Sequence, residues 1–323
     1  MTKRTIIFRA DGGSSIGMGH FTRTLALAEM LNEHFNCIFS TRQPTEYQIA
    51  EIEKICHGRI DLAEDDAHFE QFLTHLKGKE IVVLDNYYFT TDYQKAIKAK
   101  GCKLVCIDDM HDKHYVADVV INHALSEKKY FSVENYTKLF LGLEYALIRK
   151  EFFTKYKESK IDNSILISIG GSDFNNLTQN ILSFFISLKI SPKYKLFVVV
   201  GNANQKAHEI EVICKRHNFN FLKNLNAQDL SKLFDVVEYA ILPSSTIIIE
   251  ALFKKVKILG GYYVNNQKDF FEFLSKSNYI FPLGDLNNSM NYSKINIGLE
   301  SSFNNRTEIL IKHNELLNSI LEL

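Results

Sequence analysis

The sequence predicts an α/β fold made of two doubly wound domains, each built on a parallel sheet. The chain has 323 residues, which is long for one core and suited to two domains. Short apolar runs recur along it and alternate with segments of helical periodicity. These runs are continuously apolar, as expected of parallel strands that are covered by helices on both faces.

In the first half, apolar runs of strand length are separated by helical segments. The clearest helix is expected at residues 21–32, where Leu25, Ala28 and either Leu31 or Met30 lie on one face. The expected strands are residues 5–10, 36–40, 81–85, 104–108 and 119–122.

The pattern restarts near residue 160, after a polar segment at 149–163. We therefore expect one domain at residues 1–155 and a second at 156–323, which includes a final helix at 306–321 after a loop at 287–305. Parallel sheets bind ligands beyond the carboxyl ends of their strands, so we expect the two sheets to face a central cleft. The expected elements of the second half are strands 164–169, 196–200, 239–242 and 256–259, and helices 176–188, 205–217, 228–234, 247–253 and 266–276.

Composition excludes several classes of protein. The 38 basic and 38 acidic residues balance, so no net positive charge draws the chain to nucleic acid or anionic lipid. The apolar run at 6–10 is too short for a signal peptide, and no run reaches about 18 apolar residues. The five cysteines follow neither a disulfide nor a metal-binding pattern. We expect a soluble, cytoplasmic protein without a cofactor, either a monomer or a weak homo-oligomer.

A glycine-rich segment connects the first strand to the first helix. It reads Arg9-Ala10-Asp11-Gly12-Gly13-Ser14-Ser15-Ile16-Gly17-Met18-Gly19-His20. Glycines let the backbone turn sharply and approach a ligand, and the helix start offers unpaired N–H groups. His20 stands at this start, where an imidazole nitrogen can accept a proton. The alternative is a tight turn with a capping histidine.

Two segments of the second half can hold phosphates. Gly170-Gly171-Ser172-Asp173 again joins a strand to a helix, so its N–H groups and the Ser172 hydroxyl can cradle a diphosphate. Ser244, Ser245 and Thr246 begin a later helix, where hydroxyls either cap the helix or bind phosphate oxygens. Glu250, one turn further on, either faces solvent or reaches a ribose diol.

Polar residues also follow other strands. Asp85-Asn86-Tyr87-Tyr88 and Asp108-Asp109 end strands of the first half, and such groups point toward a ligand in doubly wound sheets. The amides of Asn266 and Gln267 begin a helix and either cap it or hydrogen-bond a sugar.

In this order, the segments resemble known families. The two glycine-rich loops and the Ser-Ser-Thr…Glu helix resemble the GT-B arrangement of two Rossmann-like domains, and the second half is similar to the UDP-binding domain of peptidoglycan-precursor glycosyltransferases. The first segment, extended to Arg23, resembles the signature of the UDP-2,4-diacetamido-2,4,6-trideoxy-β-L-altropyranose hydrolases of pseudaminic acid biosynthesis. Departures from that family include Gly12-Gly13, Asn86, where a histidine can occur, and Met110, where an acid can occur.

The resemblance implies hydrolysis of a UDP-sugar. Water would attack the anomeric carbon with inversion, and His20 would be the base, with Asp85 or Asp109 orienting His20 or the water. UDP leaves readily, so no metal is expected. The implied UDP ligands are Gly170, Gly171, Ser172, Asp173, Ser244, Ser245, Thr246 and Glu250, and the implied sugar contacts are Arg9, Gly17, Tyr87, Asn266 and Gln267, together with Asp85 and Asp109. The alternatives are a GT-B glycosyltransferase, a UDP-sugar 2-epimerase and a nucleotide-sugar-binding protein without catalysis.

Overall fold

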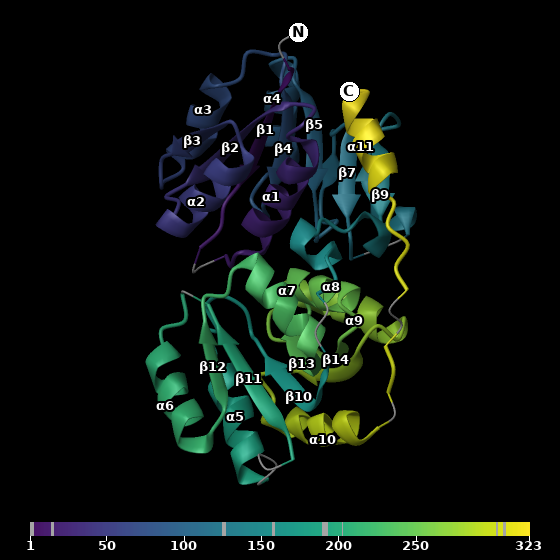
Figure 1. Cartoon of the computed structure of the whole chain (residues 1–323). Coiled ribbons are helices and arrows are strands. Elements are labelled where there is room, and N and C mark those ends of the chain that lie inside the picture. The colour runs from purple at the N-terminus through teal and green to yellow at the C-terminus, as the bar shows by residue number, and fades with distance from the viewer. Residues whose placement is uncertain are drawn as a thin grey trace. The chain divides into compact units, whose positions relative to one another are not determined.

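The computed structural model describes residues 3–13, 16–124, 127–156, 159–188, 193–201, 203–301, 303–305 and 308–323. The chain divides into two compact units. Unit 1 comprises Met1–Leu147 and Leu310–Leu323, and unit 2 comprises Ile148–Ile309. Each unit carries a parallel sheet with helices, so the predicted doubly wound α/β architecture is confirmed (Figure 1).

Unit 1 is built on a sheet whose described strands are all parallel. Their order is β3 (Gly58–Leu62), β2 (Asn36–Arg42), β1 (Thr5–Ala10), β4 (Ile81–Asp85), β5 (Lys103–Ile107), β7 (Val119–Asn122) and β9 (Lys138–Leu141). The helices are α1 (Gly19–Leu31), α2 (Glu46–Ile55), α3 (Ala67–Thr74), α4 (Thr91–Ala99) and α11 (His313–Leu321). Short elements complete the unit: β6 (His114–Tyr115), β8 (Ser132–Val133), η1 (Lys128–Tyr130) and η2 (Leu143–Tyr145).

Alternation along β1 shows how this sheet is covered on both faces. Ile6 and Phe8 pack in one cluster with residues of α1, α2 and α11, whereas Ile7 packs in another with residues of α3 and α4. Both faces are therefore dry, which explains why its strands are continuously apolar in sequence. The polar side chains of these strands lie mainly at the strand ends, as Asp85 and Asn122 do.

The last helix corrects the expected domain division. We expected residues 306–321 to complete the second domain, but α11 begins at His313 and packs on unit 1. Leu316 and Ile320 are fully buried in the cluster that contains α1. His313 Nε2 lies 2.7 Å from the Ala146 carbonyl oxygen, which fixes the start of the helix. The first boundary also lies earlier than the expected 155, between Leu147 and Ile148.

Unit 2 repeats the design. Its described strands are all parallel, in the order β12 (Asn220–Lys223), β11 (Lys195–Val200), β10 (Ile161–Ile167), β13 (Val237–Pro243), β14 (Lys257–Tyr262) and β15 (Phe281–Asp285). The helices are α5 (Leu177–Ser187), α6 (Ala207–His217), α7 (Ala227–Val236), α8 (Thr246–Phe253), α9 (Lys268–Lys276) and α10 (Ser293–Glu300), with turns η3 (Lys150–Phe153), η4 (Asn265–Gln267) and η5 (Ser289–Tyr292).

The expected loop at 287–305 is wrong in its middle, where η5 and α10 form. Ile295 and Leu299, four residues apart, are buried against the core of unit 2. This short apolar stripe decides the structure, although asparagine and serine dominate the segment's composition.

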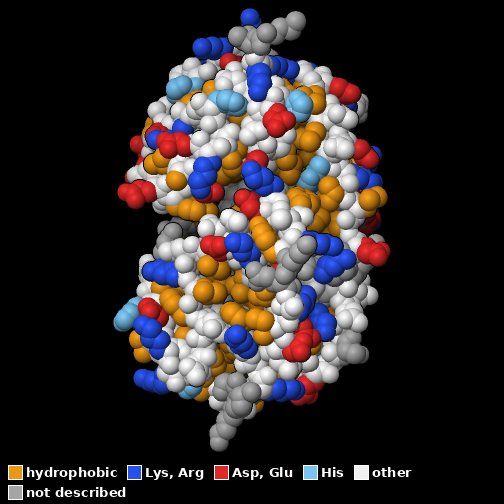
Figure 2. Space-filling model, in the orientation of Figure 1, with side chains coloured by type: hydrophobic (Ala, Val, Ile, Leu, Met, Phe, Trp, Pro, Cys, Tyr) orange, Lys and Arg blue, Asp and Glu red, His pale blue; other side chains and the backbone are white. Residues whose placement is uncertain are grey.

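Two further observations concern the surface. Within the described residues, no helix combines the length and the apolar character needed to cross a membrane. On the face seen in Figure 2, basic and acidic side chains are interspersed, in keeping with the balanced charge of the sequence.

Candidate active site

The glycine-rich segment closes into a small loop after β1. Gly13 and Gly17 exchange two backbone hydrogen bonds of 3.1 and 2.9 Å, and Gly17 has a φ of +77° that favours glycine. Gly12 is packed so closely that an added Cβ would lie 2.7 Å from Phe21 Cβ. The Ser14-Ser15 part of the segment lies outside the described residues. The loop leads directly into α1. The N-cap residue of this helix, Met18, makes no side-chain capping bond.

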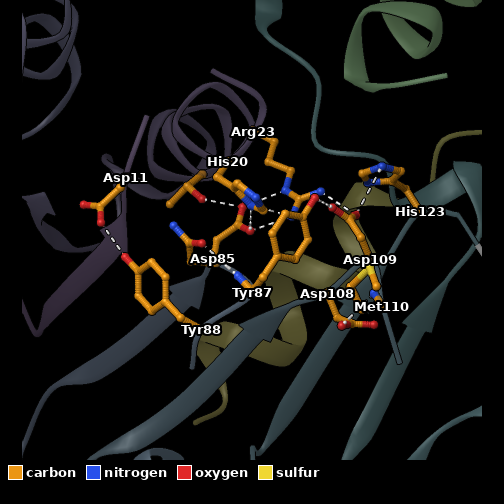
Figure 3. A network of polar contacts seen from close by, with 12 residues as sticks. Asp11, His20, Arg23, Asp85, Tyr87, Tyr88, Asp108, Asp109, Met110 and His123 are labelled. Atoms are coloured by element: carbon orange, nitrogen blue, oxygen red, sulfur yellow. Dashed lines mark hydrogen bonds and ion pairs between the residues drawn. The ribbon is translucent and has the colours of Figure 1, made fainter. Parts of the chain in front are cut away.

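His20 lies in the first turn of α1 and is 4% exposed. Its Nδ1 is 2.7 Å from Oδ1 of Asp85, the last residue of β4 (Figure 3). A carboxylate only accepts hydrogen bonds, so this contact favours the tautomer with the proton on Nδ1. Nε2 then keeps its lone pair and can accept a proton. Of the two carboxylates considered from the sequence, Asp85 is the one in contact with His20.

Arg23 joins Asp85 to Asp109. Its Nε and Nη2 donate to Asp85 at 2.6 and 2.5 Å, and its Nη1 donates to Asp109 Oδ1 at 2.5 Å. Burial alone raises the pKa of Asp85, but the Arg23 guanidinium and His20 outweigh burial and hold that pKa well below its usual range. The pKa of Asp109 is lowered in the same way, against burial, by Arg23 and two histidines. Both carboxyl groups therefore remain ionised.

Tyr87 stands on the other side of His20. The two rings meet edge to face with centroids 4.4 Å apart, and the Tyr87 hydroxyl donates to Asp109 Oδ2 at 3.3 Å. His123, directly after β7, places Nε2 3.8 Å from Asp109 Oδ1, and burial lowers its pKa to about 4. Arg23 thus contacts both carboxylates, whereas Tyr87 and His123 contact Asp109 and His20 contacts Asp85.

Asp108 makes different contacts from Asp109. Its carboxylate accepts the N–H groups of Met110 and His111 at 3.0 and 2.9 Å, and Asn122 Nδ2 at 2.9 Å. It holds the loop after β5 in place, and Figure 3 shows it turned away from His20.

Arg9 is fully buried beside the glycine-rich loop. Its Nη1 donates to Asp11 at 2.5 Å, and its Nη2 contacts Tyr88 Oη and His68 Nδ1 at 3.1 and 3.2 Å. Arg42 Nε also donates to Asp11, at 2.6 Å. This geometry gives Arg9 a part in supporting the loop, and a contact between Arg9 and a sugar stays a prediction.

In unit 2, the loop after β10 has Gly170 at a φ of +93°. The Asp173 carboxylate accepts the backbone N–H groups of Leu177 and Thr178 at 2.8 and 2.9 Å, and burial raises the pKa of Asp173. Its side chain therefore caps the start of α5. That leaves the backbone of Gly170 and Gly171 and the Ser172 hydroxyl as the polar groups of this loop that can meet a phosphate.

The start of α8 carries the three predicted hydroxyl residues. Ser245 is the N-cap residue, yet its side chain makes no capping bond, and Thr246 is the first helical residue. Ser244 is 2% exposed, and among the described residues its Oγ has no hydrogen-bond partner. Orphaned N–H groups and a buried, unpaired hydroxyl at one helix start suit an anion.

Glu250 is buried and paired rather than open. Arg149, just before η3, donates to its two oxygens from Nε and Nη2 at 2.8 and 2.9 Å. In η4, Gln267 Oε1 accepts the N–H of Tyr263, the residue after β14, at 3.1 Å, while Asn266 is half-buried on the same turn. A ribose contact of Glu250 and sugar contacts of these amides stay predictions.

Sequence reasoning missed Arg23 and His123 as members of the network. Arg23 stands three residues after His20 and so shares its helix face, which was a usable signal. His123 directly follows an expected strand, as Asp85 and Asp109 do. Among the described residues, no group of three or more His, Cys, Asp or Glu side chains is placed to hold a metal ion.

The chain has a GT-B-like fold. It superimposes on the Staphylococcus aureus MnaA–UDP co-structure with a TM-score of 0.63 and 11% identity, over 99% of this chain and 96% of that one. For Acinetobacter baumannii MurG the TM-score is 0.62 at 12% identity, over 99% and 100% of the chains. At such identities the likeness shows the fold alone. No family model matches the chain.

The sequence comparison is more specific. The chain is 27% identical over 284 residues to the UDP-2,4-diacetamido-2,4,6-trideoxy-beta-L-altropyranose hydrolase of Campylobacter jejuni, which covers 85% of this chain and 97% of that protein. It is 29% identical over 280 residues to an uncharacterized protein of Methanocaldococcus jannaschii, over 81% of this chain and 56% of that protein. The resemblance indicated by the motifs is thereby confirmed.

Proposed function

We propose that the protein is an enzyme that hydrolyses a UDP-linked diacetamido sugar, UDP-2,4-diacetamido-2,4,6-trideoxy-β-L-altropyranose, in pseudaminic acid biosynthesis. The observation that carries the proposal is the contact of 2.7 Å between His20 Nδ1 and Asp85, which prepares Nε2 as a base. The similarity to the Campylobacter jejuni hydrolase along nearly its whole length supports the choice of substrate.

In the proposed reaction, His20 Nε2 takes a proton from water while the water oxygen attacks the anomeric carbon. The bond from that carbon to the UDP oxygen breaks, its electron pair leaves with UDP, and the configuration at the carbon inverts. The proton stays on His20 as an imidazolium, which the ionised Asp85 stabilises. UDP is a good leaving group, so the step needs no strong general acid.

We assign UDP binding to unit 2. The backbone of Gly170 and Gly171, together with the Ser172 hydroxyl, would meet one phosphate, and Ser244, Ser245 and Thr246 at the start of α8 would meet the other. Asp173 would act by holding the first of these loops. Glu250 would reach the ribose only if it shares its oxygens with Arg149, which now occupies both of them.

We assign the sugar to His20 and its neighbours in unit 1. Tyr87, 38% exposed beside His20, is the side chain best placed for a sugar contact, and Gly17 lets the loop approach closely. Asp85 and Asp109 would act through His20 and Tyr87 respectively.

The test is to replace the base. His20→Asn should lower kcat for UDP release by about 100-fold or more, the scale of losing a general base, with UDP affinity changed only a few-fold. His34→Asn, at an exposed histidine of the same unit, is the matched control. Turnover of His20→Asn near that of the wild type would reject His20 as the base.

Isotope labelling tests the bond that breaks. Hydrolysis in ¹⁸O-water should place the label in the free sugar, because water attacks carbon rather than phosphorus. Label in UDP would contradict attack at the anomeric carbon. UDP release that depends on an added acceptor would indicate a glycosyltransferase, and an intact, epimerised UDP-sugar would indicate a 2-epimerase.

A further inference from the structure

Asn86 carries a buried amide donor beside the proposed base. It lies between Asp85, which contacts His20, and Tyr87, whose ring packs on His20. Its Oδ1 accepts the Tyr87 backbone N–H at 2.8 Å, so Nδ2 is the other end of the amide. Asn86 is 9% exposed, and among the described residues Nδ2 has no hydrogen-bond partner. A buried donor without a partner calls for an explanation.

The neighbouring acceptor groups are already used. The two oxygens of Asp85 accept four contacts: His20 Nδ1, Arg23 Nε, Arg23 Nη2 and Thr24 Oγ1. Asp85 therefore has little capacity left for the hydrogen of an incoming group. Next to Asp85, the side chain of Asn86 keeps an unpaired Nδ2 donor, whereas its Oδ1 already accepts the Tyr87 N–H.

This polarity selects the chemistry of the ligand. A hydroxyl group brings a hydrogen that needs an acceptor, whereas a carbonyl oxygen needs donors only. A buried, neutral amide donor also suits a neutral carbonyl better than a charged phosphate. One neutral hydrogen bond does not offset the free-energy cost of removing a phosphate from water. We propose that Asn86 Nδ2 donates to the carbonyl oxygen of an N-acyl group on the substrate sugar and so selects for that group. The proposal rests on the proposed function in that it takes the ligand of this site to be a sugar.

The position of Asn86 fits a specificity residue. It lies between Asp85 and Tyr87, which both contact His20. A neighbouring side chain has to shift before a substrate oxygen can reach the buried amide, and the adjacent Tyr87 is 38% exposed. The unpaired donor thus lies in the same cluster as the proposed base.

The experiment measures selectivity in binding, independently of turnover. Calorimetry gives the Kd of the full chain for a non-hydrolysable C-glycosidic analogue of the UDP-diacetamido sugar, the parent sugar here, and for two versions of it, each with one acetamido group replaced by a hydroxyl. The wild type should bind one analogue about 10- to 100-fold more weakly than the parent sugar, because a ring hydroxyl ends two bonds short of the lost carbonyl oxygen and leaves the buried donor unpaired. Asn86→Leu, which has no donor, and Asn86→Asp, which offers only acceptors, should reduce this ratio to within about 3-fold of one.

Each outcome decides between the claims. His20→Asn is the reference variant, and it should keep the wild-type selectivity while losing turnover. Equal binding of the parent sugar and both analogues by the wild type overturns the role of Asn86 without any variant. So does a selectivity ratio that survives in folded Asn86→Leu or Asn86→Asp, with folding checked by thermal melting. Selective binding that Asn86 controls, without UDP release, would reject the hydrolase proposal alone.

Discussion

The contacts of His20 Nδ1 decide which nitrogen is available as a base. Asp85 Oδ1 lies 2.7 Å away and can only accept, whereas Arg23 Nη2 lies 3.1 Å away and can only donate. The carboxylate makes the shorter contact, which favours the proton on Nδ1 and leaves Nε2 free to accept. The arrangement works only while Asp85 is an acceptor.

Replacing that acceptor is therefore expected to impair the base without removing it. In Asp85→Asn, the new NH2 group can donate to Nδ1, so the proton moves to Nε2. We expect kcat to fall by about 10²- to 10⁴-fold, the scale on which a wrong histidine tautomer acts. Stopped-flow or coupled assays of UDP release would measure it. Asp109→Asn, which removes a contact of Tyr87 rather than of His20, is the control, and a loss as large as that of Asp85→Asn would contradict the assignment.

Single residues also show what the sequence could and could not predict. The sequence could predict that His20, Asp85, Tyr87 and Asp109 lie together, because these residues end or follow strands or start a helix, where side chains meet in parallel sheets. The burial of Glu250 was not predictable, because its partner Arg149 is distant in sequence. Such an ion pair forms only once folding brings the two distant segments together.

At the scale of elements, the entry into α1 depends on close packing of its loop. An added Cβ on Gly12 would lie 2.7 Å from Phe21 Cβ, whereas one on Gly13 meets nothing within 4 Å. Gly12→Ala should therefore destabilise the protein by about 1–3 kcal/mol, the usual scale of overpacking, and Gly13→Ala should change stability by less than about 0.5 kcal/mol. Urea unfolding of both variants measures the difference. Equal stabilities would show that the loop relaxes around a methyl group.

The helix α11 contributes Leu316 and Ile320 to the core of unit 1, so it should stabilise that unit. Leu316 is fully buried there, whereas Leu321 of the same helix is 43% exposed. Leu316→Ala should cost about 2–5 kcal/mol of unfolding free energy, and Leu321→Ala should cost far less. Denaturant titration followed by far-UV circular dichroism would compare them. Similar small effects would mean that α11 does not stabilise unit 1.

For the whole molecule, continuous apolar runs located the inner strands of both sheets to within a few residues, but the edge strands β3, β9, β12 and β15 were not predicted. The division of the chain could not be predicted in the same way. The sequence shows that α11 is amphipathic, but nothing local tells which core receives its apolar face. The helix α10 was missed for a related reason, since burial of Ile295 and Leu299 outweighs the polar composition of its segment.

Buried neutral histidines should make stability depend on pH in a defined direction. Burial, aided by nearby arginines, lowers the pKa of His68 to about 4, and burial lowers that of His123 to about 4 as well. Burial also lowers the pKa of His313, against its bond to Ala146. All three belong to unit 1.

Between pH 6.5 and 4, the unfolded chain binds protons that the folded chain does not. The free energy of unfolding is therefore highest above about pH 6.5, the ordinary pKa of histidine, and it decreases as the pH falls toward 4. Each such proton contributes a slope of at most about 1.4 kcal/mol per pH unit. Calorimetric unfolding between pH 7.5 and 4.5 should show the transition of unit 1 moving to lower temperature below pH 6.5. His123→Asn should reduce that slope by up to the contribution of one proton. A transition temperature that stays constant down to pH 4.5 would show that these histidines are protonated as readily in the folded chain as in the unfolded one.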